Sequence, residues 1–150
     1  MANTYSSLFY HLVFSTKYRK RHIFPNIEER VWRFIAGVAR KNKITPIKLG
    51  GIEDHLHSLV LSPPKYSPSQ IVQMLKIESS RWFHEELGKK SFGWQNGYAA
   101  FSVNKRSVPR VVAYIENQRE HHQKFSFEDE YKELLRLHEV DIVDERYLFG

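Results

Sequence analysis

The 150-residue chain contains no cysteine, so disulfides, thiolate metal sites and cysteine nucleophiles are all excluded. Any metal must instead be held by histidine, carboxylate or amide groups. No apolar run approaches the roughly 20 residues of a membrane-spanning helix, and the N-terminal stretch MANTYSSLFYHLVF lacks the basic-then-apolar order of a signal peptide. Low-complexity runs are also missing. We therefore expect one globular domain over residues 1–150, no membrane partner and a cytoplasmic location.

Positive charge is concentrated in the first 125 residues. Residues 1–125 carry 20 Lys and Arg against 9 Asp and Glu, a net charge of +11, whereas residues 126–150 carry 3 against 8, a net charge of −5. A basic body favours a polyanionic partner, most simply nucleic acid, and an ordinary solvated basic surface is the equal alternative. The acidic tail, residues 126–150, either packs on a basic surface of this chain or of a partner subunit, or forms a solvated helix. We take the solvated helix as the default.

Hydrophobic periodicity predicts four strands and three main helices. The expected strands cover residues 8–14, 44–50, 55–61 and 97–104, and the expected helices begin after Asn26, Ser67 and Ser107. This order, βαββαβ followed by more helix, predicts an α+β, ferredoxin-like sandwich. We expect a four-stranded antiparallel sheet with both long helices on one face, together with a C-terminal helix and tail.

Two histidines separated by one residue lie in the third expected strand. Because side chains alternate along a strand, His55 and His57 point to the same side, where two imidazoles can chelate one ion. Eight histidines in 150 residues make such a pair common by chance, so a packed or surface pair is the better interpretation of this feature alone. The preceding Glu53 and Asp54 either orient a liganding imidazole or simply end a turn.

A second group of polar residues lies in AYIENQREHH, residues 113–122. Tyr114 and Gln118 are four apart on the expected third helix and therefore share one face. Gln118 could add an oxygen ligand beside the two histidines, with Tyr114 close to the ion, although a half-buried tyrosine beside a solvated amide is the commoner meaning of such a pair. His121 and His122 lie one turn beyond Gln118, where an approach to the ion is one alternative, but we expect them first at the helix surface or against DNA. No spacing favours ligation at the other histidines, which are His11, His22, His84 and His138.

His55, His57, Tyr114 and Gln118 together suit phosphodiester chemistry. A tyrosine hydroxyl has a pKa near 10 and is a poor nucleophile at neutral pH. A divalent ion on a non-bridging phosphate oxygen makes the phosphorus more electrophilic and orients the leaving group. The products would be a covalent phosphotyrosine and a free hydroxyl. Rejoining would need no nucleotide cofactor, because the phosphotyrosine bond retains the energy of the broken one.

The segment Asp54-His55-Leu56-His57 and the segment YIENQ, residues 114–118, closely resemble the motifs of HUH-class single-tyrosine transposases of the insertion sequence 200/605-like group. The similarity extends over nearly the whole chain, through YHLVFSTKYR near the start, the Leu75-Lys76 element, WQNGYAAFSV and NQREHH. This resemblance implies a transposase that cuts single-stranded DNA at element-end hairpins, becomes linked to the 5′ side through Tyr114, and rejoins strands. It also implies that His55, His57 and Gln118 bind Mg²⁺ or Mn²⁺.

The resemblance further implies a homodimer in which the tyrosine helix can complete the partner subunit's site, so that Tyr114 acts in cis or in trans. Imidazoles generally suit Zn, Cu or Ni, whereas Mg²⁺ prefers oxygen, so we expect weak Mg²⁺ binding without DNA. Basic residues flanking the proposed site are expected to contact phosphates, with ordinary solubility as the alternative for each. These residues are Lys17, Arg19, Lys20, Arg21, Lys76, Arg81, Lys105, Arg106 and Arg110.

Two alternatives stay open at this point. The stretch GYAAFSV echoes the aromatic strand motif of RNA-recognition domains, which share the same sheet order, so a non-catalytic module that binds single-stranded nucleic acid is one of them. Such a module has no use for the histidine pair or for Tyr114 and Gln118. The other is a domesticated relative that acts on hairpins of host repeats.

Overall fold

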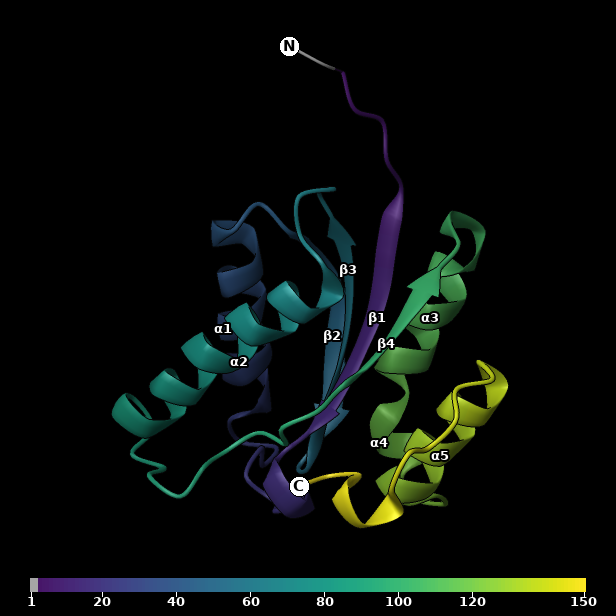
Figure 1. Ribbon diagram of the computed structural model, residues 1–150. Coiled ribbons are helices and arrows are strands. Elements are labelled where there is room, and N and C mark those ends of the chain that lie inside the picture. The colour runs from purple at the N-terminus through teal and green to yellow at the C-terminus, as the bar shows by residue number, and fades with distance from the viewer. Residues whose placement is uncertain (1–2) are drawn as a thin grey trace.

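The computed structural model describes residues 3–150 and contains one four-stranded antiparallel sheet. Its strands are β1 (Leu8–Ser15), β2 (Thr45–Ile52), β3 (His55–Ser62) and β4 (Ala99–Val103). They lie in the order β2-β3-β1-β4, so β1 and β3 are central (Figure 1). Val13 pairs with His57 and His11 with Leu59 in the β1–β3 register. The expected ferredoxin-like α+β arrangement is confirmed.

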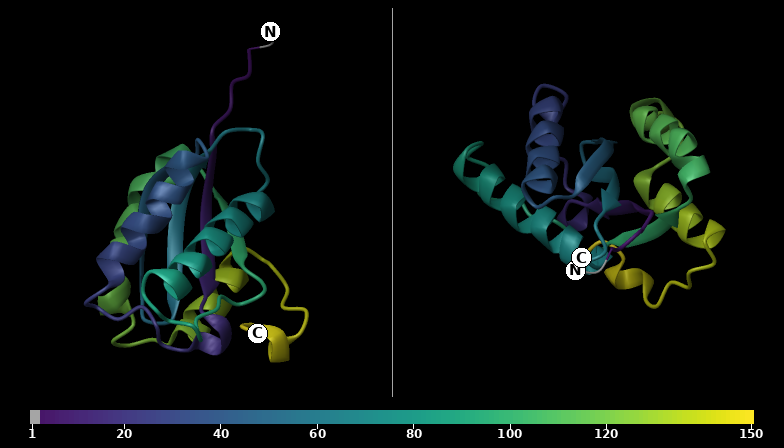
Figure 2. Two further views of the ribbon diagram at one scale, coloured as in Figure 1. Left: turned by 90° about the vertical axis from the view of Figure 1, so that its left-hand side faces the viewer. Right: turned by 90° about the horizontal axis from the view of Figure 1, so that it is seen from above.

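Two long helices cover one face of the sheet. They are α1 (Glu28–Lys41) and α2 (Pro68–Glu85), which lie together on one side of the sheet in both views of Figure 2. Ser67 caps α2 through a capping box with Gln70, as its position before a proline predicts. Alternate residues of the central strands, among them Leu12, Phe14, Leu56 and Val60, pack against the apolar sides of these helices. The opposite side chains of β1 and β3 are thereby directed to the other face.

That second face is covered by the C-terminal third of the chain. The helices on this face are α3 (Val108–Glu116), α4 (Gln118–His121) and α5 (Phe127–Leu137) (Figure 2). Elsewhere in the chain, short 3-10 helices occur at Lys17–Arg19, Lys105–Ser107 and Glu145–Tyr147. Phe127 and Tyr131 of α5 pack with Val13 and Phe101 of the sheet. The acidic tail is therefore not a solvated helix, and our default expectation for it was wrong. Ser126 caps α5, and apolar residues recurring along the helix bury it against the sheet.

A close approach fixes α3 against the sheet. A Cβ atom added to Gly50 of β2 would lie 2.8 Å from both the carbonyl oxygen and a side-chain carbon of Ile115. Only glycine leaves room for the α3 backbone at this point. The close packing sets the depth at which the segment carrying Tyr114 and Gln118 rests on the sheet.

The expected third helix is interrupted. We predicted one continuous helix through Gln118, but the helical conformation ends at Asn117, with φ −93° and ψ 17°, and resumes as the short α4. The fourth strand also begins at Ala99, later than the expected residue 97. Within residues 3–150, no helix combines the length and apolar character needed to cross a membrane.

Candidate active site

His55 and His57 lie on the face of β3 that α3, α4 and α5 cover, and both are fully buried. His55 is held from two sides. Its Nδ1 is 2.8 Å from Asp54 Oδ1, and its Nε2 is 2.7 Å from Gln118 Oε1. A carboxylate on Nδ1 favours the tautomer whose Nε2 carries the free lone pair, which is the arrangement of a histidine prepared to bind a metal.

His57 is likewise flanked by two polar partners. Its Nδ1 lies 2.8 Å from Nε2 of His11, and its Nε2 lies 3.1 Å from Glu130 Oε1. Burial lowers the pKa of His57, although the negative charge of Glu130 opposes that shift. Burial also lowers the pKa of His11, to about 3, so this ring is neutral at physiological pH.

Tyr114 and Gln118 meet despite the break between their helices. Gln118 is buried, and its Nε2 donates a hydrogen bond to Glu130 Oε2 over 2.8 Å. The hydroxyl of Tyr114 donates a short hydrogen bond to the same oxygen. Burial, reinforced by the negative charge of Glu130, raises the pKa of Tyr114 well above its usual value. In this state the phenol is firmly protonated.

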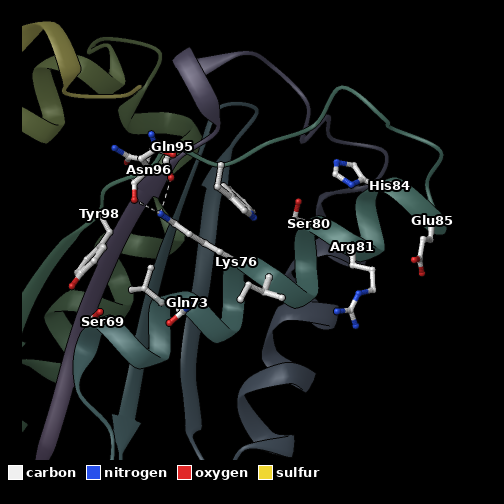
Figure 3. A pocket seen from close by; sticks show the side chains of 13 residues that line it. Ser69, Gln73, Lys76, Ser80, Arg81, His84, Glu85, Gln95, Asn96 and Tyr98 are labelled. Atoms are coloured by element: carbon white, nitrogen blue, oxygen red, sulfur yellow. Dashed lines mark hydrogen bonds between the residues drawn. The ribbon is translucent and has the colours of Figure 1, made fainter.

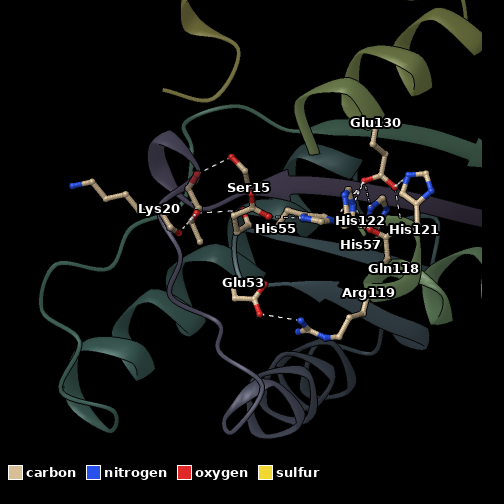
Figure 4. A network of polar contacts seen from close by, with 12 residues as sticks. Ser15, Lys20, Glu53, His55, His57, Gln118, Arg119, His121, His122 and Glu130 are labelled. Carbon is tan, nitrogen blue, oxygen red and sulfur yellow. Dashed lines mark hydrogen bonds and ion pairs between the residues drawn. The ribbon is translucent and has the colours of Figure 1, made fainter. Parts of the chain in front are cut away.

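Glu130 was missed by the sequence analysis and occupies the centre of the site (Figure 4). It comes from α5, in the acidic tail, and is 4% exposed. Burial by itself would disfavour its charge, but the surrounding histidines hold the pKa of Glu130 far below the usual carboxyl range. A sequence signal existed. Glu130 falls three residues after Phe127 and four before Leu134, on the apolar side of an amphipathic helix, where a carboxylate needs a partner.

His122 is a second correction. We expected it at the helix surface or against DNA, but its side chain is 3% exposed and its Nε2 lies 3.0 Å from both Gln118 Oε1 and Glu130 Oε1. His121 is partly exposed, at 29% of its side chain, with Nε2 3.4 Å from Glu130. His11, for which no spacing had suggested a role, touches His57 directly.

The donor atoms fit a divalent ion of the hard or borderline kind. Ligand atoms of His55, His122 and Glu130 all lie within 4.8 Å of one another. Separations of 2.7 Å between His55 and Gln118, and of 3.1 Å between His57 and Glu130, match the spacing of neighbouring ligands about 2.1 Å from an octahedral ion. The carboxylate adds a second, negatively charged oxygen to the amide oxygen of Gln118, so the donor set suits Mg²⁺ or Mn²⁺ better than two imidazoles and an amide alone.

A pair of salt bridges anchors α4 beside this site. Arg119 lies 3.0 Å from Glu53 in the turn between β2 and β3 (Figure 4). It also lies 2.9 Å from Glu28 at the start of α1. Of the two acidic residues before the histidine pair, Asp54 therefore contacts the imidazole of His55, while Glu53 positions the segment that carries Gln118.

The basic residues expected to contact DNA lie on both sides of the sheet. Lys105, Arg106 and Arg110 lie at the entry to α3, and Arg110 borders a cavity of about 440 Å³ that reaches Tyr114 and His11. Lys17, Arg19, Lys20 and Arg21 follow β1. Lys76 and Arg81 lie on α2 (Figure 3), which covers the face of the sheet opposite to His55 and His57. Arg19 and Lys76 are partly buried and the other seven are exposed.

Lys76 differs from the other basic residues. Its ammonium donates to the carbonyl oxygens of Gln95 and Gly97, each over 2.7 Å, at the edge of a cavity of about 680 Å³ (Figure 3). Burial lowers its pKa to about 8. Two of its donors are thereby directed at the backbone of the segment before β4, so Lys76 is less available for phosphate contact than its position in the sequence suggested.

Known proteins resemble this chain over most of its length. Residues 4–118 match the family described as Transposase IS200 like. The chain is 28% identical over 126 residues to the transposase for insertion sequence element IS200 of Salmonella typhimurium, covering 80% of this chain and 82% of that protein. It is 25% identical over 115 residues to the ISDra2 transposase TnpA of Deinococcus radiodurans, covering 73% and 82%.

Solved structures share the fold. One is a proposed transposase from Deinococcus radiodurans R1, with a TM-score of 0.63, 22% identity, and coverage of 79% of this chain and 95% of that one. Another is a REP-associated tyrosine transposase bound to a REP hairpin, with a TM-score of 0.59, 15% identity, and coverage of 81% and 73%. Because the family match covers residues 4–118, from before the first strand through Gln118, the chain belongs to the family of IS200-like transposases.

Proposed function

We propose that this chain cleaves and rejoins single-stranded DNA at element-end hairpins, with Tyr114 as the nucleophile. One observation carries the proposal: the Tyr114 hydroxyl, the Gln118 amide and the Nε2 atom of His57 all converge on a single buried carboxylate, Glu130. A phenol, two imidazoles, an amide and a carboxylate, each within hydrogen-bond distance of at least one of the others, are the groups that metal-assisted phosphoryl transfer needs.

The proposed metal ligands are His55, His57 and Gln118, with Glu130 added on structural grounds and His122 within reach. A bound Mg²⁺ or Mn²⁺ would act as a Lewis acid on a non-bridging phosphate oxygen and would favour the phenolate of Tyr114. Asp54 contacts Nδ1 of His55 and His11 contacts Nδ1 of His57, so each imidazole is held through the nitrogen that does not face the proposed metal. The burial of these groups excludes water, which strengthens every charge interaction in the site.

Tyr114 supplies the covalent chemistry in this proposal. Its Oη forms a bond to the scissile phosphorus while the bond from phosphorus to the 3′ oxygen breaks, giving a 5′-phosphotyrosine and a 3′ hydroxyl. The phenolic proton is lost and the departing oxygen gains one. Because the pKa of Glu130 lies far below that of Tyr114, this carboxylate orients the phenol and does not store its proton.

Electrostatics favours one approach for the DNA. Two cavities border Tyr114. One, of about 570 Å³, is lined by the carboxylates of Asp129, Glu130 and Glu133, which repel a phosphate. The other, of about 440 Å³, contains Arg110 and no Asp or Glu among its lining residues. We assign the scissile strand to the Arg110 side, and the basic residues at the entry to α3 continue that path.

Hairpin DNA is the substrate we propose, in keeping with the hairpin bound by the structurally similar REP-associated transposase. The RNA-recognition alternative is disfavoured, because α3, α4 and α5 cover the sheet face that such domains leave open. Phe101 of GYAAFSV is only 5% exposed there and has no surface on which to stack a base. A domesticated relative would use the same chemistry on host repeats.

The proposed site forms within one chain, so we propose that Tyr114 acts in cis in this conformation. Its hydroxyl reaches the carboxylate that also contacts His57 of the same polypeptide, and Arg119 ties α4 to the body of the same chain. A homodimer remains part of the proposal. Exchange of the tyrosine helix between two subunits would require the ion pairs of Arg119, the ion pair of Lys48 with Glu116, the hydrogen bonds of Gln118 and the packing of α3 to open.

The decisive assay detects the covalent product. The protein is incubated with Mn²⁺ and a labelled single-stranded hairpin from its own genomic flanks, and adducts are separated on a denaturing gel. Tyr114→Phe should abolish the adduct and keep hairpin binding, while Tyr5→Phe, at an 89% exposed tyrosine, should leave the adduct unchanged. An adduct that survives in Tyr114→Phe would show that the nucleophile is another residue.

A further inference from the structure

His11 lies directly behind one of the proposed metal ligands. It is in the middle of β1, on the same side of the sheet as Val13, and is a diagonal neighbour of His57 across the β1–β3 pair. Its Nε2 is 2.8 Å from Nδ1 of His57, and the two rings stack with their centres 5.0 Å apart. The side chain sits beside Phe101 and near Tyr114 and is 5% exposed as a residue.

The imidazole of His11 occupies a position of β1 whose nearest neighbours on the same face are apolar. Phe9 and Val13, its neighbours on the same face of β1, are both buried hydrophobic residues. Burying an imidazole costs free energy unless it is hydrogen-bonded, and the bond to His57 is the one that offsets this cost. The role of His11 therefore lies in its effect on His57.

A neutral imidazole carries one proton on two nitrogens, so binding a metal through one nitrogen requires the proton on the other. His57 directs Nε2 into the site, 3.1 Å from Glu130, and Nδ1 toward His11. To offer the lone pair of Nε2, His57 must carry its proton on Nδ1 and donate it in a hydrogen bond. The acceptor at that position is Nε2 of His11.

The same logic operates at His55, where the partner differs. Asp54 Oδ1 accepts from Nδ1 of His55 and directs Nε2 of that ring toward Gln118. One proposed ligand is thus supported by a carboxylate and the other by a neutral ring. A neutral acceptor fixes the tautomer of His57 without adding a negative charge to a site that already contains Glu130 and must also admit a phosphate.

We propose that His11 is a positioning residue for metal binding: its Nε2 accepts the hydrogen bond of His57 Nδ1 and thereby presents Nε2 of His57 as a ligand. The inference rests on the proposed metal site and deepens it. It requires an acceptor atom at this point in space and no particular ring. When His57 donates from Nδ1, the proton of His11 resides on its own Nδ1, so both rings stay neutral and no net proton is exchanged.

Two substitutions that introduce side chains of similar size distinguish a hydrogen-bond acceptor at position 11 from a side chain that only fills the space. In His11→Gln the amide oxygen reaches about the depth of the original Nε2 and can accept from His57, whereas His11→Met fills the space without a strong acceptor. Mn²⁺ affinity is measured without DNA by electron paramagnetic resonance of the free ion. We expect His11→Met to weaken binding about 10- to 100-fold, the usual effect of losing such a partner, and His11→Gln to stay within a few-fold of wild type.

The controls distinguish this role from a structural one. His138→Met changes a histidine that lines the same cavity and stacks on Phe101, and this variant should bind Mn²⁺ like wild type. Circular dichroism verifies that each variant is folded. The tautomer itself is read from nitrogen chemical shifts of ¹⁵N-labelled histidine with Mg²⁺ bound, where His57 should carry its proton on Nδ1 in wild type and in His11→Gln.

The outcomes are separable from those of the cleavage assay. Equal Mn²⁺ affinity in folded His11→Met and wild type would overturn the role of His11 and leave the metal site intact. Equal losses of Mn²⁺ affinity in the Gln and Met variants would also overturn the proposal, because an acceptor at this position would then not be sufficient to support His57. A wild-type protein that binds no Mn²⁺ would overturn the metal site and this inference together, while the test of Tyr114 as nucleophile would stand on its own.

Discussion

Replacing Glu130 with glutamine tests whether a buried, charged carboxylate organises the site. The carboxylate accepts hydrogen bonds from Tyr114 and Gln118, and it lies 3.1 Å from His57 and 3.0 Å from His122. Hydrogen bonds to a charged group contribute about 1.5–3 kcal/mol each to the free energy of unfolding. Breaking a buried ionic cluster by removing one partner costs about 3–5 kcal/mol. Glutamine keeps the shape and one acceptor oxygen of the glutamate, so we expect the free energy of unfolding to fall by about 2–3 kcal/mol.

The assay is urea unfolding followed by circular dichroism at pH 7, with a chelator present. For a chain of this length the loss corresponds to a fall in Tm of about 4–12 °C. Since the pKa of Glu130 is lowered in the folded protein, its contribution is present above the ordinary carboxyl pKa of about 4.5 and is lost as the pH falls below it. The difference in the free energy of unfolding between wild type and Glu130→Gln should therefore decrease in acid.

Glu133→Gln is the matched control. Glu133 lies on the same helix three residues further on, is exposed, and pairs only locally with Arg136. Its replacement should leave the free energy of unfolding unchanged within the error of the measurement. If Glu130→Gln unfolds as wild type does, within that same margin, the carboxylate does not hold the site together and the reasoning fails.

Because burial lowers the folded-state pKa of His11 to about 3, the neutral ring is fully accommodated above pH 6.5, and protonation should destabilise the fold by several kcal/mol as the pH falls from 6.5 toward 3. The free energy of unfolding measured across this range should fall less steeply in His11→Gln. Gly50→Ala should destabilise the fold by about 1–3 kcal/mol and reduce adduct formation, since its new methyl group would meet Ile115; a wild-type Tm would contradict the close packing. Mixing Tyr114→Phe with His57→Ala should restore no adduct if the tyrosine acts in cis, whereas restored activity would establish action in trans.

The sequence predicted the part of this protein that depends on local periodicity. Alternation along β3 correctly placed His55 and His57 on one side and Leu56 and Val60 on the other. The order of strands and helices led directly to the observed sheet, because few topologies accommodate βαββαβ with short connections. The residues at positions 55, 57, 114 and 118 that the motifs singled out lie together in the structure.

What sequence reasoning missed depends on contacts between distant segments. Glu130 lies in a segment whose many charges suggested solvation, and only tertiary packing turns its side of α5 inward. His122 lies one turn beyond Gln118, but its burial depends on Glu130 of α5, a contact between segments that the helix pattern alone does not predict. His11 has no spacing relation to His57, since 46 residues separate two side chains that the β1–β3 register brings together.

Peptide mapping of the protein–DNA adduct tests the central claim most directly. The adduct formed with Mn²⁺ and a hairpin substrate is digested with a protease and a nuclease, and mass spectrometry locates the residual nucleotide. The account predicts a 5′-phosphate ester on Tyr114 within the peptide that spans α3. A nucleotide attached to any other residue, or DNA cleaved with no covalent attachment to the protein, would contradict it.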